Sequence, residues 1–191
     1  MEPALLSDMA SPESSTSPPR FWPRVARALR LDPSLYDELE ADATGFAQAT
    51  SVVLVAGLAR GVYGLEAEGA VGVVGSLIGA VIIWFAAAAV LSAVGVRWVH
   101  GTTDFGEMLR TLGFAAAPLW LLAAGGLVTG PAHLAIGIAA HAWAVAASVV
   151  AVRQALDTDT ARAFATFGLA IGVGAGLLLL LGALVASCVG A

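Results

Sequence analysis

Two histidines in one apolar stretch are the side chains best suited to chemistry in this sequence. His133 and His141 lie eight residues apart within the uncharged segment 111–152. In a helix they would share one face and stand about 12 Å apart along its axis, too far to chelate one metal ion. His141, the deeper of the two, could relay protons or bind a ligand. The alternative is a hydrogen-bonded histidine that only packs between helices.

Other catalytic arrangements find little support in the residue spacing. Ser148 follows His141 by seven residues, which places it about 10 Å further along the same helix. A nucleophile and its base must lie about 3 Å apart. The sequence holds no H-E-x-x-H motif, and its single cysteine, Cys188, cannot build a disulfide or a cysteine metal site alone. We therefore expect a non-enzymatic protein without a metal or cofactor.

The composition of the chain predicts the kind of fold that must position these histidines. The chain has 191 residues, of which 59% are hydrophobic and only 12% charged, against about 25% charged in average globular proteins. This favours an all-α integral membrane protein. All nine cations are arginine and the net charge is −5, which argues against nucleic-acid binding. Arginine without lysine in an alanine-rich chain also suggests a GC-rich bacterial genome.

The segment before the membrane region divides into a tail and two short helices. Residues 1–19 are rich in serine and proline, and we expect a disordered cytoplasmic tail. Residues 20–44 predict two cytoplasmic or interfacial amphipathic helices. The first would lie in the lipid headgroup layer, or would be a simple juxtamembrane turn; its interfacial residues are Arg20, Trp22, Arg24, Arg27 and Arg30. The second begins at Asp32-Pro33 and carries acids that form either a partner surface or a solvated face.

Five apolar segments are long enough to cross a bilayer, which needs roughly 20 residues each. Thr111–Val152 contains 42 uncharged residues, about 63 Å as one helix, and must fold back. Thr129-Gly130-Pro131 predicts the turn. The sequence therefore predicts a five-transmembrane-helix bundle over residues 45–190, with spans at about 45–63, 71–96, 109–128, 132–152 and 163–188.

The arginines predict the orientation of these spans. One arginine, Arg60, falls on one side, and eight fall on the other: Arg20, Arg24, Arg27, Arg30, Arg97, Arg110, Arg153 and Arg162. Arginine and lysine gather on the cytoplasmic side of membrane proteins. We therefore expect a cytoplasmic N-terminus and an external C-terminus, in a bacterial cytoplasmic membrane.

The two inner loops carry further candidate functional or packing residues. Asp104 and Glu107 have the spacing of a capping box, which starts a helix and is followed by Arg110. Arg153 and Arg162 flank the second loop. Both loops follow a loose common order, which indicates either a parallel repeat, as in some transporters, or chance in a biased composition.

Proline and glycine predict helix shape and packing. Pro118 lies within the third span, where it cannot donate to the Phe114 carbonyl, so we expect a kink that serves as a hinge or only shapes the bundle. Glycines four residues apart, such as Gly57 with Gly61 and Gly75 with Gly79, allow helices to approach closely. We expect a leucine at Gly75 to disrupt bundle or dimer packing.

Three segments together form a recognisable pattern. The longest is Gly101-Thr-Thr-Asp-Phe-Gly-Glu-Met-Leu-Arg-Thr-Leu-Gly-Phe-Ala-Ala-Ala-Pro118; the others are Leu31–Leu39 before the first span and Ala151–Ala163 between the last two. These segments resemble the Yip-domain family of Rab-interacting-type membrane proteins, in its bacterial branch. The resemblance covers about 31–188. It implies a five-helix bundle with a cytoplasmic N-terminus. Eukaryotic members act in vesicle traffic and bind Rab GTPases; their Asp-Leu-Tyr-Gly-Pro signature is absent from this chain.

Two classes of function remain open on this evidence. The first is a non-enzymatic scaffold or membrane-organising protein that acts through its cytoplasmic helices on a protein partner. The second is a small transporter, channel or lipid-handling protein that uses Pro118 and His141. We favour the first, because the spans contain no acid for coupled ion transport. Membrane lipids are expected partners in both, and a homo-oligomer is compatible with both.

Overall fold

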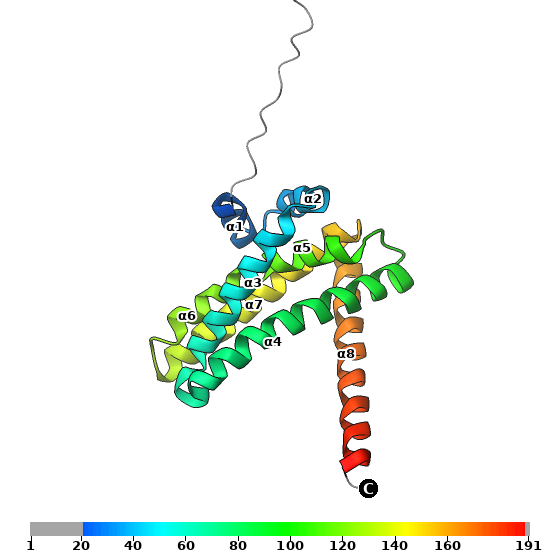
Figure 1. Ribbon diagram of the computed structural model, residues 1–191. Coiled ribbons are helices and arrows are strands. Elements are labelled where there is room, and N and C mark those ends of the chain that lie inside the picture. Colours follow the sequence, from blue (N-terminus) through cyan, green and yellow to red (C-terminus); the bar gives the residue numbers. More distant parts are fainter. Residues whose placement is uncertain (1–20, 190–191) are drawn as a thin grey trace, which may run out of the picture.

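The structure is a computed structural model that describes the backbone of residues 21–189 and the side chains of residues 21–176 and Leu179. The predicted tail at 1–19 and Arg20 lie outside these residues. Every regular element in the described part is helical, and the first elements are α1 (Phe21–Leu29), α2 (Pro33–Ala41), α3 (Gly45–Tyr63) and α4 (Leu65–Val94) (Figure 1). The chain continues through a π-helical turn (Gly95–Val99), α5 (Phe105–Ala115), a 3-10 turn (Ala117–Leu121), α6 (Leu122–Gly125), α7 (Gly130–Ala155) and α8 (Thr160–Val189).

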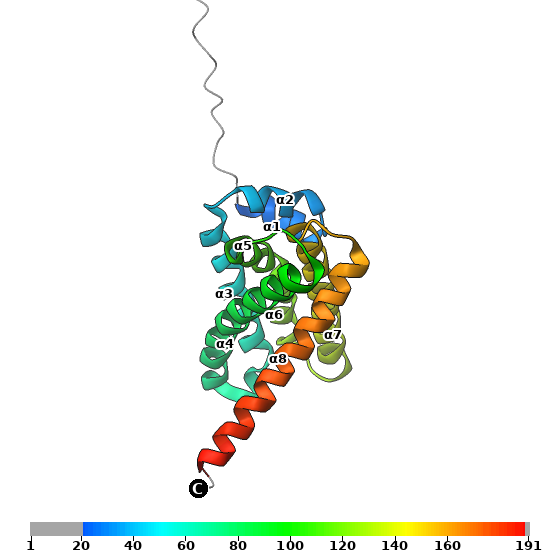
Figure 2. The same ribbon diagram turned by 90° about the vertical axis from the view of Figure 1, so that its right-hand side faces the viewer.

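The long helices run side by side between two ends of the molecule. The two short helices α1 and α2 cover one end, and the α3–α4 and α6–α7 connections lie at the other (Figures 1 and 2). Helix α8 starts beside α4 and α7 and then diverges from them, so that its end projects alone on the side opposite α1 and α2 (Figure 1). Such an arrangement places the residues before α3 and the α4–α5 and α7–α8 loops at a common end.

The predicted spans agree with the helices in position, with differences at their ends. Within the described residues, four helical segments are long and apolar enough to cross a membrane: Gly45–Tyr63, Leu65–Val99, Phe105–Gly125 and Gly130–Ala155. The first has the predicted bounds, while the second and fourth are longer at both ends. The third begins before residue 109 because the capping box at Asp104 starts the helix earlier, and it ends at Gly125. The fifth predicted span falls in α8, a helix of 30 residues, most of whose C-terminal side chains lie outside the described residues.

The third span is not one continuous α-helix. Helix α5 ends at Ala115, and a 3-10 turn with Pro118 near its start precedes the short α6. Pro118 has no amide hydrogen to donate to a preceding carbonyl, so the α-helical pattern is interrupted there, as its position predicted. The turn is held against α3 by Trp120, whose indole Nε1 donates to the Val52 carbonyl at 3.0 Å.

Glycines bring α3 and α4 into close contact at one of the two pairs that the sequence indicated, Gly57 with Gly61, and not at Gly75 with Gly79. A Cβ at Gly61 would lie 2.7 Å from the Val73 backbone, and one at Gly57 would lie 2.9 Å from the Ala80 side chain. At Gly75 and Gly79 an added Cβ meets no atom within 4 Å. The structure therefore gives Gly75 no close contact within the bundle, and the contact glycines between α3 and α4 are Gly57 and Gly61, where an added Cβ would meet the neighbouring helix.

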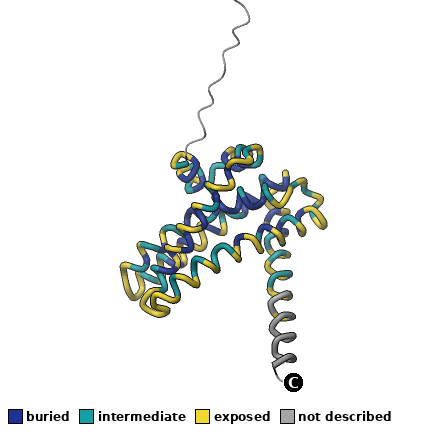
Figure 3. The backbone as a smooth tube through the Cα atoms, viewed as in Figure 1, coloured by how far each residue is buried: buried dark blue, intermediate teal, exposed yellow. Residues whose placement is uncertain are grey.

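The buried core is concentrated towards the end that carries α1 and α2 (Figure 3). The α2 side chains Leu35, Tyr36 and Leu39 are fully buried, as are Met108 and Phe114 of α5. Burying apolar side chains of this size supplies most of the packing free energy. Helices α1 and α2 are thus part of the folded core, and they fix the geometry of the polar groups described next.

Candidate functional site

Helices α1 and α2 cover one end of the bundle. We call residues 21–42, which include both helices, the platform. The second helix starts where the sequence predicted: the Asp32 carboxylate accepts from the Ser34 amide at 3.0 Å, and Pro33 occupies the first turn. Aspartate at this position satisfies an amide that lacks a helical partner, and proline costs nothing there. The local sequence therefore determines where α2 begins and how it turns back across α1.

The apolar face of α1 packs on the protein itself. Val25 and Ala28 are 4% and 0% exposed, and the helix contacts α5 and the 3-10 turn. Of its apolar residues, Trp22 remains 69% exposed, with its ring edge-on to Trp120 at 6.2 Å between centroids. The amphipathic pattern that suggested a lipid-bound helix thus reflects burial against α5, and Trp22 remains suited to the headgroup layer.

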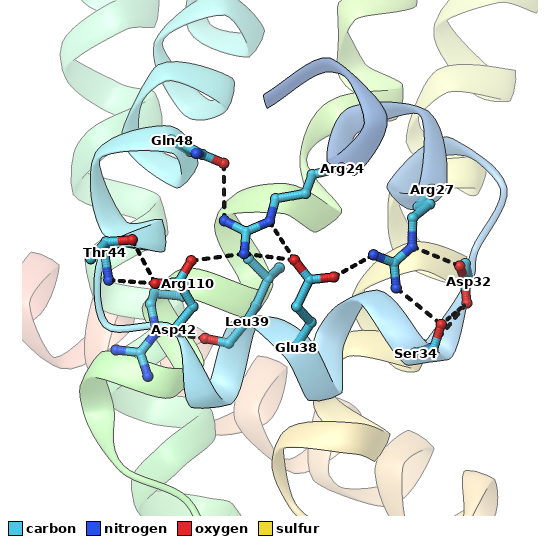
Figure 4. A network of polar contacts seen from close by, with 10 residues as sticks. All are labelled: Arg24, Arg27, Asp32, Ser34, Glu38, Leu39, Asp42, Thr44, Gln48 and Arg110. Carbon is cyan, nitrogen blue, oxygen red and sulfur yellow. Dashed lines mark hydrogen bonds and ion pairs between the residues drawn. The ribbon is translucent and has the colours of Figure 1, made fainter. Parts of the chain in front are cut away.

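Arg24 is the centre of the polar contacts in the platform (Figure 4). Its side chain is only 2% exposed, and its guanidinium donates to Glu38 and Asp42, each at 2.7 Å through Nη2. A third donor, Nη1, reaches the side-chain oxygen of Gln48 in α3 at 3.1 Å. We predicted an interfacial position for Arg24; the structure instead places it inside the platform, because two carboxylates and an amide there replace its water shell.

Arg27 extends this network to the start of α2. Its Nε donates to the Asp32 carboxylate at 2.9 Å, and its Nη1 pairs with Glu38. Arg27 was also predicted to face the headgroups, yet its guanidinium is engaged with α2. Arg30 is exposed and has no side-chain partner among the described residues. Of the predicted interfacial arginines that the structure describes, Arg30 alone is therefore available to solvent or lipid.

The ion pairs alter the protonation of the platform acids. Burial alone would raise the pKa of Glu38, but hydrogen bonds from Arg27 and Arg24 outweigh burial and hold that pKa below its ordinary value. The pKa of Asp42 is lowered mainly by the hydrogen bond from Thr44, with a smaller contribution from Arg24. Both carboxylates therefore remain charged at neutral pH, and the network is intact there.

Arg110 connects the platform to the third span. Its Nε donates to the Leu39 carbonyl and its Nη2 to the Glu40 carbonyl, both at 2.8 Å. These carbonyls lie in the last turn of α2, where a cation satisfies acceptors that lack a helical partner. The capping box between Asp104 and Glu107 is present, with the Glu107 amide 2.8 Å from Asp104 and the reciprocal bond at 3.0 Å. It sets the start of α5 and hence the position of Arg110.

Glu40 is the platform acid with the opposite protonation tendency. Burial, followed by the negative charges of Asp157, Glu107 and Asp37, raises its pKa to about 7. Its Oε1 atom is buried without a hydrogen-bond partner in the described part of the chain. Burial without a hydrogen-bond partner disfavours the ionised form of this carboxyl, so we expect the docking of α2 to depend on pH near neutrality.

The remaining loop residues join the α7–α8 connection to the platform. Gln154 donates to Asp37 of α2 at 2.7 Å, and Arg153 donates to Gln154 at 3.1 Å. Thr102 of the α4–α5 loop donates to Asp157 at 3.1 Å. Arg162 lies apart from these contacts: its one ion-pair partner within the described part of the chain is Asp159, at 3.5 Å, and its side chain is exposed. The structure thus brings Arg110 and Arg153 to the platform and leaves Arg162 at the surface.

The two histidines have different environments. His133 stacks on Tyr63 with ring centroids 3.9 Å apart, and its Nδ1 lies 3.0 Å from the Gly125 carbonyl. His141 lies two turns further along α7 in an exposed position, and its Nδ1 bonds the Gly137 carbonyl of its own helix at 2.8 Å. His133, rather than His141, therefore holds helices together in the described structure.

Sequence reasoning missed the pairing of α1 with α2. The signal was present, because the first helix carries arginines three residues apart, the second carries several acids, and the two are joined by a tight turn at Leu31. Each helix was considered alone as a surface for lipid or partner. Complementary charge on adjacent short helices was the indication that they bind each other.

A family model supplies the remaining evidence on identity. The Yip1 domain model matches residues 14–183, which include the platform and all four candidate spans of the described residues. The chain belongs to the Yip1 domain family. Searches of the curated proteins and of the solved structures found no match. This Yip1 domain protein is thus a membrane protein with several apolar helices.

Proposed function

We propose that this Yip1 domain protein is a non-enzymatic scaffold that presents the platform to a cytoplasmic protein partner. The observation that carries the proposal is the nearly complete burial of Arg24 between Glu38, Asp42 and Gln48. A buried cation shared by three partners fixes the relative orientation of α1 and α2, since any other orientation leaves charges unpaired. A rigid surface costs less free energy to bind than two loose helices would.

The orientation of the platform follows from the arginines and from the packing. Contacts of α2 with α5 and α7 gather Arg110 and Arg153 at the platform end, and Arg60 lies at the connection between α3 and α4, at the other end. The positive-inside rule assigns the arginine-rich end to the cytoplasm. With α8 as a fifth crossing, the C-terminus would lie outside a bacterial cytoplasmic membrane.

Site-specific photo-crosslinking tests the scaffold proposal directly. A photoreactive residue at Ala41, which is exposed on α2 and has no side-chain role, should give one discrete protein adduct in living cells. The matched position is Leu127, which is 82% exposed at the opposite end, where only lipid or self adducts are expected. If Ala41 gives no adduct, or gives the same adducts as Leu127, the platform is not a docking surface.

A further inference from the structure

A groove opens along the side of the bundle, away from the platform. It has a volume of about 750 Å³, is almost entirely apolar, and is lined by parts of α3 to α8. Its wall on α4 includes Gly75, Gly79 and Trp84, and its wall on α7 includes His141 and Ser148. Volumes of this order hold a ligand of several hundred daltons. Phe167 of α8 also lines the groove, and α8 then diverges from α4 (Figure 1).

The polar atoms of the groove wall are largely satisfied within the protein. The Ser148 hydroxyl donates to the Ala144 carbonyl at 2.8 Å, and the Nδ1 of His141 donates to Gly137. The two glycines of α4 leave open space, since a Cβ at either one meets no atom within 4 Å. From Gly72 to Trp84 the wall is about 18 Å long. The middle of the groove therefore suits an extended hydrocarbon chain.

One end of the groove carries opposite charges. Arg60, from the end of α3, and Glu68, from the first turns of α4, both line it and form a loose ion pair at 3.5 Å. Their side chains are 44% and 45% exposed. Glu68 lies against Gly64 and Gly72, where a Cβ would come within 3.2 Å and 2.3 Å of its atoms. The two glycines thus let this carboxylate fold over the end of the groove beside Arg60.

We propose that the groove binds one phospholipid with a zwitterionic, amine-bearing headgroup. One acyl chain lies along α4 between Gly72 and Trp84, the phosphate accepts hydrogen bonds from Arg60, and the ammonium group donates to Glu68. An adjacent cation and anion match a headgroup that carries both charges, whereas an anionic headgroup leaves Glu68 opposing it. The acyl chain gains contacts with a fixed apolar wall.

Native mass spectrometry of the full chain tests this site with two defined lipids of equal chain length, phosphatidylethanolamine and phosphatidylglycerol. The wild-type chain should retain one phosphatidylethanolamine. An added Cβ at Gly79 meets no atom within 4 Å, so Gly79→Leu should occupy the groove and weaken that binding about tenfold or more. Gly172→Leu on α8 is the matched control, because it adds the same side chain at an equally open position that does not line the groove. It should bind lipid as the wild type does.

Substitutions of the two charged residues that face the headgroup test the role of each charge by itself. Glu68→Gln should lose the preference for phosphatidylethanolamine over phosphatidylglycerol, and Arg60→Gln should weaken binding of both. Equal binding of both lipids by the wild type overturns the headgroup assignment, and unchanged binding by Gly79→Leu overturns the groove as the site. A wild-type chain that carries no lipid but forms a dimer abolished by Gly79→Leu would show that a second copy covers the groove.

Discussion

Charged side chains in this protein serve mainly to join its helices. Arg24, Arg27 and Arg110 were each identified from sequence as functional or interfacial residues, and each has its guanidinium engaged with α2. The capping residues Asp104 and Glu107 were predictable, because a cap depends only on four consecutive residues. The partners of Arg24 lie 14 and 18 residues away, and a contact of that range requires the fold.

Replacing Arg24 by methionine keeps much of its volume and removes the charge. Because Glu38 and Asp42 would then be buried in part without a cation, we expect the docking of α1 and α2 to weaken by about 3 kcal/mol. Amide hydrogen exchange in lipid discs should report this as faster exchange of α1 and α2 with the bundle unchanged. Arg30→Met is the matched control, and equal effects of the two variants would contradict the network.

The raised pKa of Glu40 predicts that the stability of the platform depends on pH. The pKa of Glu40 is raised from 4.5 to about 7, so the docked state favours the protonated acid. Its stabilising contribution is complete below about pH 4.5 and is lost as the pH rises through 7. The thermal unfolding midpoint should therefore fall between pH 5.5 and pH 8, a range in which the acids with lowered pKa stay ionised. Glu40→Gln should remove this fall; a fall of the same size in that variant would exclude Glu40 as its source.

At the level of elements, the lengths of the apolar segments predicted where the long helices lie better than they predicted the residues at which those helices begin and end. Gly45–Tyr63 agrees with the predicted span because an arginine and a turn glycine bound it. Helix α4, which contains the second predicted span, begins at Leu65 and includes two glutamates, since charge at the end of a span does not stop a helix from forming. The 3-10 turn at Pro118 was predictable as a kink, but its attachment to α3 through Trp120 was not.

Leucine substitutions at two glycines should have different effects on stability, depending on whether the glycine contacts a neighbouring helix or faces open space. Gly57→Leu places a side chain against α4 and should destabilise the bundle by several kcal/mol, because the backbones cannot separate without losing other contacts. Gly75→Leu extends into the open groove and should leave the thermal unfolding midpoint nearly unchanged. Differential scanning fluorimetry in one detergent compares the two; equal destabilisation would show that α3 and α4 pack differently.

At the scale of the whole molecule, composition alone predicted a membrane protein, and the Yip1 domain match agrees with it. The arrangement of the helices could not be derived from composition, because the long helices α3, α4, α7 and α8 are apolar on nearly all sides. The divergence of α8 and the groove beside it depend on which small residues face which neighbour. The resemblance in three short segments was more informative than periodicity, since it gave the order of the elements.

Thiol labelling tests the number of crossings. With Cys188→Ser as background, Ala191→Cys should react with a membrane-impermeant maleimide in intact cells, because five crossings place that end outside. Ser34→Cys on α2 should react only in inverted vesicles. Labelling of both positions from the same side of the membrane would mean an even number of crossings.

Binding of a protein partner to the platform is tested most directly by mass spectrometry of the intact assembly in native lipid. The wild-type chain should carry one partner protein in a fixed ratio, Arg24→Met should lose it, and Arg30→Met should retain it if the fixed orientation of α1 and α2 is what the partner recognises. A wild-type assembly that contains only this chain and lipid would contradict the scaffold function.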